Sequence, residues 1–396
     1  MMSGKQQGVS IKQLAVLSLF TLVTYACQVQ ADKPWVTGYI PAYAQGQGGS
    51  MPFMESEDWK MLTHVVHNSI SIKPDGSLDF DANLFSPANR AAAIREAHQQ
   101  GVPILLGLSG WITNYQQVVN DASARTALVN GLLAVMREGY DGIDVDLEPL
   151  TEWGKEKAGN PGYVAFVNEL HAAMQSYKPP LSAKPLLMVA IIGRDCVVLT
   201  GLESKLDQIN LMLYDMASTW EDMTWHDSAL YSGKDVYAGT DKKVASVERE
   251  VEACQQAGLP RHKLGLGINL ETRLWIGGVS EPRQSWGMLA AKPRHYMTSP
   301  DVPKESYADL LKKYYKPEYY QWDDSAKVPY LKIDKPGSKE DMFVSFNDER
   351  SVQEKVQYMH KAGLGGLMIW SMQLDYRPEQ PEGQRRPIMK AIRAAF

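Results

Sequence analysis

Short runs of apolar and β-branched residues recur along the chain, and longer segments with a helical spacing of apolar positions separate them. Runs of this length and composition predict β-strands. Pro103 stands just before one of them, at a position that a strand tolerates. The predicted strands are residues 36–40, 63–70, 104–108, 142–147, 187–192, 208–214, 264–270 and 367–370.

The segments between the predicted strands have the periodicity of amphipathic helices. Several of them end at a glycine, such as Gly101, Gly258 or Gly363, and glycine is favoured at a left-handed helix C-cap. The predicted helices include residues 88–100, 122–138, 163–176, 244–257 and 349–362. Eight strands in alternation with helices predict an α/β fold, a (β/α)8 TIM barrel.

One interval interrupts this alternation. Residues 276–345 are rich in Tyr, Lys, Pro and Asp, and they hold one helical pattern, at 306–315. Their many aromatic side chains argue for a packed unit and against a long disordered loop. We therefore predict a small α+β insertion domain at 276–345, between the seventh strand and the last helices, in a catalytic barrel built from 32–275 and 346–396.

The first residues of the chain have a different character. Lys5 and Lys12 precede an uncharged, mostly apolar run at 14–26, and the small-residue pattern Val29-Gln30-Ala31 follows. This order predicts a secretory signal peptide at 1–31, because the apolar run is too short to span a bilayer. The sequence leaves open a lipid-modified Cys27. We expect a secreted or periplasmic protein with no membrane partner after signal removal.

The overall composition excludes some partners. The chain has a formal net charge of −5, with 44% apolar and 22% charged residues, and its basic and acidic residues are interspersed. Nucleic acid is therefore not an expected partner, and we expect a monomer.

After signal removal the remaining cysteines are Cys196 and Cys254. A bridge between them stays open, although the predicted barrel would place them on different layers.

The motif with the clearest chemistry is Asp141-Gly142-Ile143-Asp144-Val145-Asp146-Leu147-Glu148. Strand alternation directs Asp144, Asp146 and Glu148 to one face and the apolar residues to the other. Three carboxylates inside a barrel repel one another and lose hydration, which raises their pKa and lets one stay protonated as a general acid. Glu148 is last on the strand, at the carboxyl-terminal mouth where barrel active sites lie.

This motif resembles the DxxDxDxE signature of glycoside hydrolase family 18, which includes chitinases and endo-β-N-acetylglucosaminidases. The similarity extends over nearly all of the chain after residue 31, and the insertion stands where many chitinases of the family carry one. The stretch from 214 to 231 is similar to bacterial-type chitinases, which favours chitin as the substrate. Further similar segments are 36–39, the M-x-Y-D motif at 212–215, and residues 267–275, 343–348 and 363–370.

The resemblance implies a retaining, substrate-assisted hydrolysis, in which the substrate's acetamido oxygen attacks the anomeric carbon. It implies that Glu148 protonates the glycosidic oxygen. Asp146 would orient the acetamido group and share a proton with Asp144. Tyr214 would donate its hydroxyl to the acetamido oxygen, with Asp215 beside the same subsite.

The resemblance also assigns residues that contact the sugar. Trp370 would form the apolar floor beneath the distorted sugar ring. Asp141, at the start of its strand, is expected to be a structural hydrogen-bond acceptor. The remaining candidates for substrate contact are Tyr39, Met212 and Arg273, with Trp111, Trp220 and Trp275 as stacking platforms.

The sequence departs from the family pattern near the carboxylates. The third strand usually reads S-x-G-G in the family, whereas here Gly107 stands in the place of the serine that supports the first buried aspartate. We expect Gly107→Ser to be tolerated and to shift the acidic limb of the pH–rate profile. Leu147 replaces a common aromatic residue and Pro149 stands where tyrosine is frequent, so the mouth of the cleft is expected to differ.

Two other functions are compatible with the same motif. An endo-β-N-acetylglucosaminidase acting on N-glycans would use the same residues, and a non-catalytic lectin would lack the terminal glutamate, whereas Glu148 is present.

His64 and His67 have helical spacing but lie on a predicted strand, which turns them to opposite faces and argues against a metal site. No cofactor or metal is implied.

Overall fold

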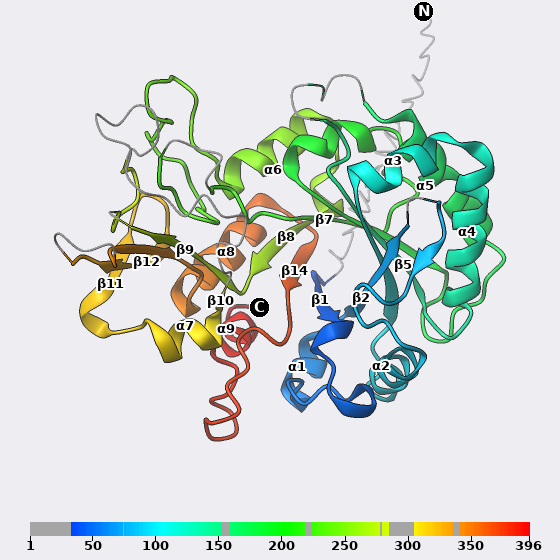
Figure 1. Ribbon diagram of the computed structural model, residues 1–396, viewed down its shortest axis with the longest axis horizontal. Helices are drawn as coiled ribbons and strands as arrows, with labels where there is room; N and C mark the ends of the chain where they lie inside the picture. Colours follow the sequence, from blue (N-terminus) through cyan, green and yellow to red (C-terminus); the bar gives the residue numbers. More distant parts are fainter. Residues whose placement is uncertain are drawn as a thin grey trace, which may run out of the picture. The chain divides into compact units, whose positions relative to one another are not determined.

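Eight parallel strands form a closed barrel in the computed structural model (Figure 1). The structure describes residues 33–396 except 74, 153–154, 156–158, 219–222, 278, 285–304 and 336–339. β1 pairs with both β2 and β14, which closes the barrel and confirms the predicted (β/α)8 fold. The barrel strands are β1 (Trp35–Pro41), β2 (His64–Ile72), β4 (Ile104–Trp111), β5 (Gly142–Glu148), β6 (Leu186–Ile191), β7 (Gln208–Leu211), β8 (Leu264–Asn269) and β14 (Gly366–Trp370).

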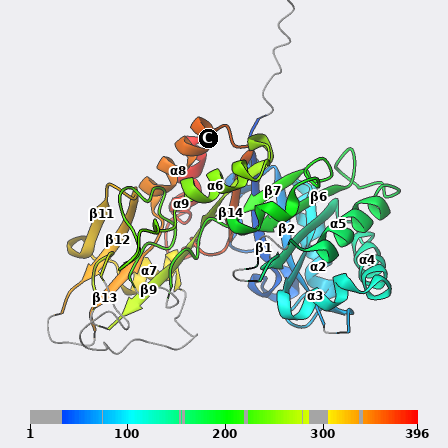
Figure 2. The ribbon, with the colours of Figure 1, turned by 90° about the horizontal axis from the view of Figure 1, so that it is seen from above.

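Helices surround the barrel, as the views in Figures 1 and 2 show. Five of them lie where the sequence predicts helices: α2 (Pro87–Gln99), α4 (Ala122–Met136), α5 (Pro161–Met174), α6 (Val247–Gln256) and α8 (Glu349–Ala362). Side chains such as Ser86 and Asp121 accept a backbone hydrogen bond at their N-caps, which fixes where these helices begin. Elements that the sequence did not predict include α1 (Ser56–Met61), α3 (Ile112–Asn120), α9 (Pro387–Ala395) and the 3₁₀ helix η4 (Gly193–Leu199) after β6.

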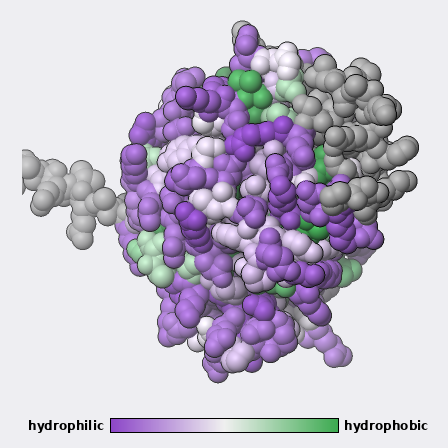
Figure 3. All heavy atoms as spheres, turned by 90° about the vertical axis from the view of Figure 1, so that its left-hand side faces the viewer, coloured by the Kyte–Doolittle hydropathy of each residue, from purple (hydrophilic) through white to green (hydrophobic). Residues whose placement is uncertain are grey.

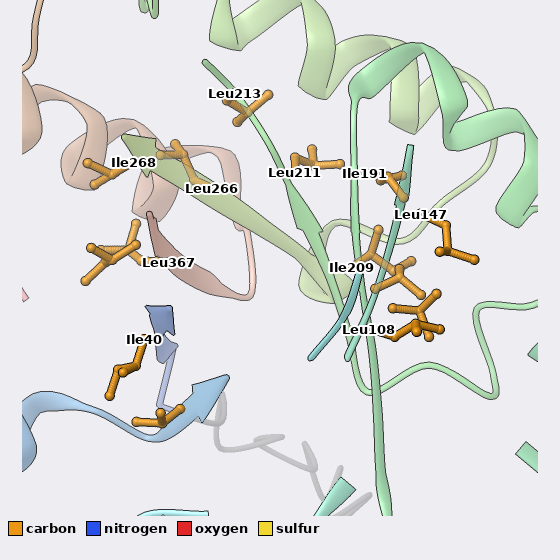
Figure 4. Packing of buried hydrophobic residues seen from close by; sticks show 14 of the residues in the cluster. Ile40, Leu108, Leu147, Ile191, Ile209, Leu211, Leu213, Leu266, Ile268 and Leu367 are labelled. Carbon is orange, nitrogen blue, oxygen red and sulfur yellow. The ribbon is translucent and has the colours of Figure 1, made fainter. Parts of the chain in front are cut away.

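The alternation along each strand separates two apolar layers. On β5, Val145 and Leu147 belong to the large core between the barrel and its helices, together with the side chains in Figure 4. Inward positions of the other strands, together with Met212 and Tyr214 just after β7, fill the barrel with a second cluster. Its buried members are Tyr39, Val66, Leu105, Met188, Ala190, Met212, Tyr214 and Met368. The inward carboxylates of β5 therefore meet a mixed aromatic and sulfur-containing interior.

A second sheet lies between β8 and α8 in the chain and to one side of the barrel in Figure 2. It is antiparallel, with the order β10-β9-β13-β12-β11, and the short helix α7 (Tyr307–Lys313) follows β10. Its strands are β9 (Glu271–Ile276), β10 (Glu305–Ser306), β11 (Tyr320–Asp323), β12 (Val328–Ile333) and β13 (Met342–Ser345). Residues 271–275, which the sequence assigned to the barrel, thus pair within this sheet. The face of the protein that carries it is mostly hydrophilic (Figure 3).

Cys196 and Cys254 form a disulfide, which corrects the expectation that they lie on different layers. Their Cα atoms are 5.0 Å apart. Cys196 belongs to η4 and Cys254 to α6, and these two elements pack against each other outside the barrel. The expectation failed because η4, which follows β6, packs against α6, so both cysteines belong to the same apolar core.

The predicted signal peptide at 1–31 and the candidate stacking residue Trp220 lie outside the described residues. Within the described ranges, the structure has no helix long and apolar enough to cross a membrane.

Candidate active site

A pocket with a volume of about 160 Å³ opens among the carboxyl ends of the barrel strands. Ten residues line it: Tyr39, Asp146, Glu148, Ala190, Ile192, Met212, Tyr214, Asp215, Met368 and Trp370. Seven of the ten are candidates from the sequence, and Ala190, Ile192 and Met368 are not. The three missed residues are apolar strand positions, and nothing in their local sequence separates them from ordinary core residues.

The three acids of β5 become more exposed toward the mouth of the barrel. Asp144 is completely buried, and Asp146 and Glu148 are half-buried. Pairing with β4 places Gly107 beside Asp144 and Trp111 beside Glu148. The alternation predicted from the sequence therefore lines the acids up from the barrel interior to the pocket, with Glu148 outermost.

Burial changes the acidity of the two inner carboxyls. Asp144 accepts a hydrogen bond from the Tyr39 hydroxyl at 3.0 Å, but burial still raises the pKa of Asp144 from 3.8 to about 7. Burial and the charges of Glu148 and Asp144 raise the pKa of Asp146 well above its usual value. Oδ1 of each aspartate is buried and accepts no hydrogen bond within the described part of the chain. At neutral pH the Asp144–Asp146 pair therefore stays partly protonated, close to Glu148.

Two tyrosines and one tryptophan complete the pocket wall. Burial raises the pKa of both Tyr39 and Tyr214, with nearby carboxylates adding to the effect, so both hydroxyls stay protonated and can donate. The Tyr214 hydroxyl lies 3.8 Å from Sδ of Met368. Trp370 meets Tyr39 edge-on, with ring centroids 5.9 Å apart. This wall offers hydroxyl donors next to an apolar surface, which suits a sugar ring that carries an amide substituent.

Asp215 is held at the rim by a buried arginine. Its backbone has a positive φ of 55°, and its carboxylate pairs with the Arg273 guanidinium. Arg273 also donates to Asp227 at 2.8 Å and to Ser218 at 3.2 Å. Arg273 does not line the pocket, so it reaches the site through Asp215. Asp227 was not predicted from the sequence, because an isolated aspartate in a loop carries no pattern.

The tryptophans named as stacking platforms occupy different environments. Trp111 ends β4 beside Glu148 and is 58% exposed. Trp275 is 6% exposed and packs in a cluster with Trp225 and Phe343 near the second sheet. Pairing of β9 with β13 turns the Trp275 ring into that cluster, so the structure does not bring it to the pocket.

Asp141 lies at the opposite end of β5 from the pocket. It is completely buried and accepts hydrogen bonds from the backbone N–H groups of Ile104, at 3.0 Å, and Leu181, at 2.7 Å. His98 Nε2 lies 2.9 Å from the same carboxylate. These contacts tie β5 to neighbouring segments at the closed end of the barrel.

The surroundings of Gly107 show what a serine at this position would meet. A Cβ atom on Gly107 would lie 3.0 Å from the carbonyl oxygen of His67 and 3.1 Å from the Cα of Asn68. Both contacts are to backbone atoms of β2, which cannot turn away as a flexible side chain can. A serine here forces β2 to shift by a few tenths of an ångström.

Comparison with known proteins identifies the family. Residues 36–375 match the Glycosyl hydrolases family 18. Chitotriosidase-1 of Mus musculus is 30% identical over 68% of this chain and 58% of its own length, and Chitinase B of Serratia marcescens is 25% identical over 86% and 79%. The crystal structure of Ostrinia furnacalis Group IV chitinase in complex with allosamidin superposes with a TM-score of 0.70 at 22% identity, over 91% of this chain and 98% of the other. The matched family spans most of the chain, which therefore belongs to glycoside hydrolase family 18.

Proposed function

We propose that this chain hydrolyses β-1,4-linked N-acetylglucosamine polymers, chitin and chitooligosaccharides, with retention of the anomeric configuration. The observation that carries the proposal is that Glu148 and Asp146 line one pocket with Tyr214 and Trp370 at the carboxyl ends of the barrel strands. The similarity to proteins named as chitinases supports the choice of substrate.

Glu148 is the general acid and base in this proposal. It protonates the glycosidic oxygen as the C–O bond breaks, while the acetamido oxygen of the substrate attacks the anomeric carbon and forms an oxazolinium ion. Water then opens that ion from the face on which the leaving group departed, and Glu148 removes a proton from the water. The configuration at the anomeric carbon is thereby retained.

The neighbouring groups prepare the acetamido group for attack. Asp146 accepts the acetamido N–H, which increases the electron density on the acetamido oxygen, and a proton shared with Asp144 limits the charge repulsion inside the barrel. Tyr214 donates to the acetamido oxygen, and Trp370 supplies the apolar floor. Trp111, exposed beside Glu148, offers a face on which a further sugar can stack.

Turnover of N-acetylglucosamine oligomers of defined length tests the proposal. Glu148→Gln should lower kcat by about 10² to 10⁴ and leave oligomer affinity largely intact, because the acid acts mainly in the transition state. NMR of the nascent product should show the β anomer first, and a thiazoline analogue of the oxazolinium ion should inhibit. Full activity of Glu148→Gln, or the α anomer first, would refute the proposed mechanism.

We further propose that residues 1–31 direct export and are removed, as their charged, apolar and small-residue order predicts. N-terminal sequencing of the native protein tests this proposal, with a start near Asp32 as the expected result. An intact chain beginning at Met1 in the cytosol would contradict it.

A further inference from the structure

The three residues after Glu148, Pro149 to Thr151, are held by side chains from other parts of the chain. These side chains belong to Tyr115, Asn160, Arg194 and Asp195, which we call the 149–151 clamp. We infer that the clamp positions the catalytic acid and that Asp195 is its central positioning residue. This inference rests on the proposed role of Glu148.

The clamp lies where the sheet stops supporting β5. β4 pairs with β5 as far as Glu148, but pairing with β6 ends at Val145 opposite Val189. Beyond that point β6 no longer pairs with β5, and Ala190 and Ile192 line the pocket. The last residues of β5 therefore lack backbone pairing with β6 on the side where the pocket opens. Other contacts are needed on that side to fix the position of Glu148.

Asp195 supplies two of these contacts. Its Oδ2 accepts the backbone N–H of Leu150 at 2.8 Å, and its Oδ1 accepts the hydroxyl of Thr151 at 2.7 Å. Asp195 is 1% exposed, so solvent does not compete for either bond. Arg194, the preceding residue, donates to the carbonyl of Thr151 at 2.8 Å. One short stretch of η4 therefore fixes both ends of the Leu150–Thr151 pair.

Two further side chains hold the remaining carbonyl groups. The hydroxyl of Tyr115 on α3 donates to the carbonyl of Pro149 at 2.5 Å. Nδ2 of Asn160, the N-cap residue of α5, donates to the carbonyl of Leu150 at 2.8 Å. Tyr115 is completely buried and Asn160 is 6% exposed. Each carbonyl of residues 149–151 thus has a side-chain donor, and together they restrict the segment in more than one direction.

The clamp connects Glu148 to the outer helical layer. Asp195 directly precedes Cys196, whose disulfide to Cys254 joins η4 to α6. The clamp residues outside η4 are Tyr115, on α3, and Asn160, at the N-cap of α5. The position of the segment after the acid is consequently set by three outer elements. A displacement of about 1 Å at a reacting group can cost on the order of 10² in rate.

Substitutions at Asp195 test the inference. Asp195→Ala removes both contacts and should lower kcat on N-acetylglucosamine oligomers by about 10- to 100-fold, with KM within threefold of wild type. Asp195→Asn should keep kcat within threefold, because its oxygen can accept from Leu150 while its amide donates to the Thr151 hydroxyl. Asp207→Ala is the matched control, since Asp207 accepts the backbone N–H of Leu187 at the opposite end of β6. Its kcat should be unchanged.

A double-mutant cycle separates positioning from a general loss of folded protein. In the Glu148→Gln background the acid is already absent, so adding Asp195→Ala should reduce the residual kcat by less than threefold. A general loss of folded protein would reduce it by the same factor as in the wild-type background. If Asp195→Ala does not fold, Tyr115→Phe takes its place in the cycle, because it keeps the ring and removes only the bond to Pro149.

Each outcome of this cycle decides the inference. It is supported when kcat falls more than threefold in the wild-type background and not in the Glu148→Gln background. It is overturned when kcat of both Asp195→Ala and Tyr115→Phe stays within threefold of wild type, or when the loss is equal in the two backgrounds. An inactive wild-type chain would instead refute the proposed function, which keeps the two failures distinct.

Discussion

The completely buried Asp144 links the stability of the fold to pH. Its Oδ2 accepts the Tyr39 hydroxyl at 3.0 Å, and burial raises its pKa from 3.8 to about 7. Asp144→Asn keeps the shape of the side chain and an acceptor for Tyr39, but it cannot ionise. The variant therefore imitates the protonated carboxyl at every pH.

The magnitude follows from the difference in pKa between the folded and unfolded states. An aspartate in an unfolded chain has a pKa of about 3.9, so the folded protein holds a proton between about pH 4 and pH 7 that the unfolded chain has lost. The free energy of unfolding then falls by about 1.4 kcal/mol per pH unit over this window. The stabilisation is fully present below pH 4 and lost as pH rises through 7, a total of about 4 kcal/mol.

Urea unfolding of wild type and Asp144→Asn at pH 4, 6 and 8 measures this effect. The free energy of unfolding of the variant relative to wild type should increase by about 4 kcal/mol from pH 4 to pH 8, whatever the constant offset between the two proteins. Leu147→Val, on the outward face of the same strand, is the control, because it changes stability without a titrating group. A difference between Asp144→Asn and wild type that stays constant within about 1 kcal/mol across this range would refute the raised pKa.

Three further predictions follow from the pocket, from β4 and from the disulfide. Tyr214→Phe removes a buried hydroxyl from the pocket and should lower kcat by about 10²-fold; steady-state kinetics on oligomers tests it, and an unchanged kcat would remove Tyr214 from the mechanism. Gly107→Ser should destabilise the fold by about 1–3 kcal/mol through its contacts with the β2 backbone, and an unaltered urea midpoint would show that β2 yields freely. Replacing Cys196 and Cys254 together by alanine should lower the free energy of unfolding by about 4 kcal/mol, because the bridge links residues 58 positions apart and restricts the unfolded chain. Calorimetry measures this loss, and an unshifted Tm would contradict the reasoning.

The barrel and the inner face of its acidic strand could be predicted because they depend on local periodicity. A strand turns successive side chains to opposite faces, so the spacing of Asp144, Asp146 and Glu148 already places them together before any tertiary contact is known. The order of strands and helices along the chain likewise leads to a closed barrel. The helices α3 and α9 were not predicted, although apolar residues recur in both at helical spacing.

Other features depended on which distant segments meet. Trp275 follows the seventh barrel strand, as a sugar platform would, but pairing of β9 with β13 directs it into a core cluster. The Cys196–Cys254 bridge requires η4 to pack on α6, and no pattern near either cysteine indicates this packing.

The same division holds within the active site. The sequence by itself determined that Glu148 ends its strand at the mouth of a barrel, because alternation and strand order are properties of neighbouring residues. Only the tertiary structure decided that Tyr115 and Asp195 hold the segment that follows Glu148. These contacts join residues far apart in the chain, and barrel closure with packing of the outer helices is what brings them within hydrogen-bonding distance.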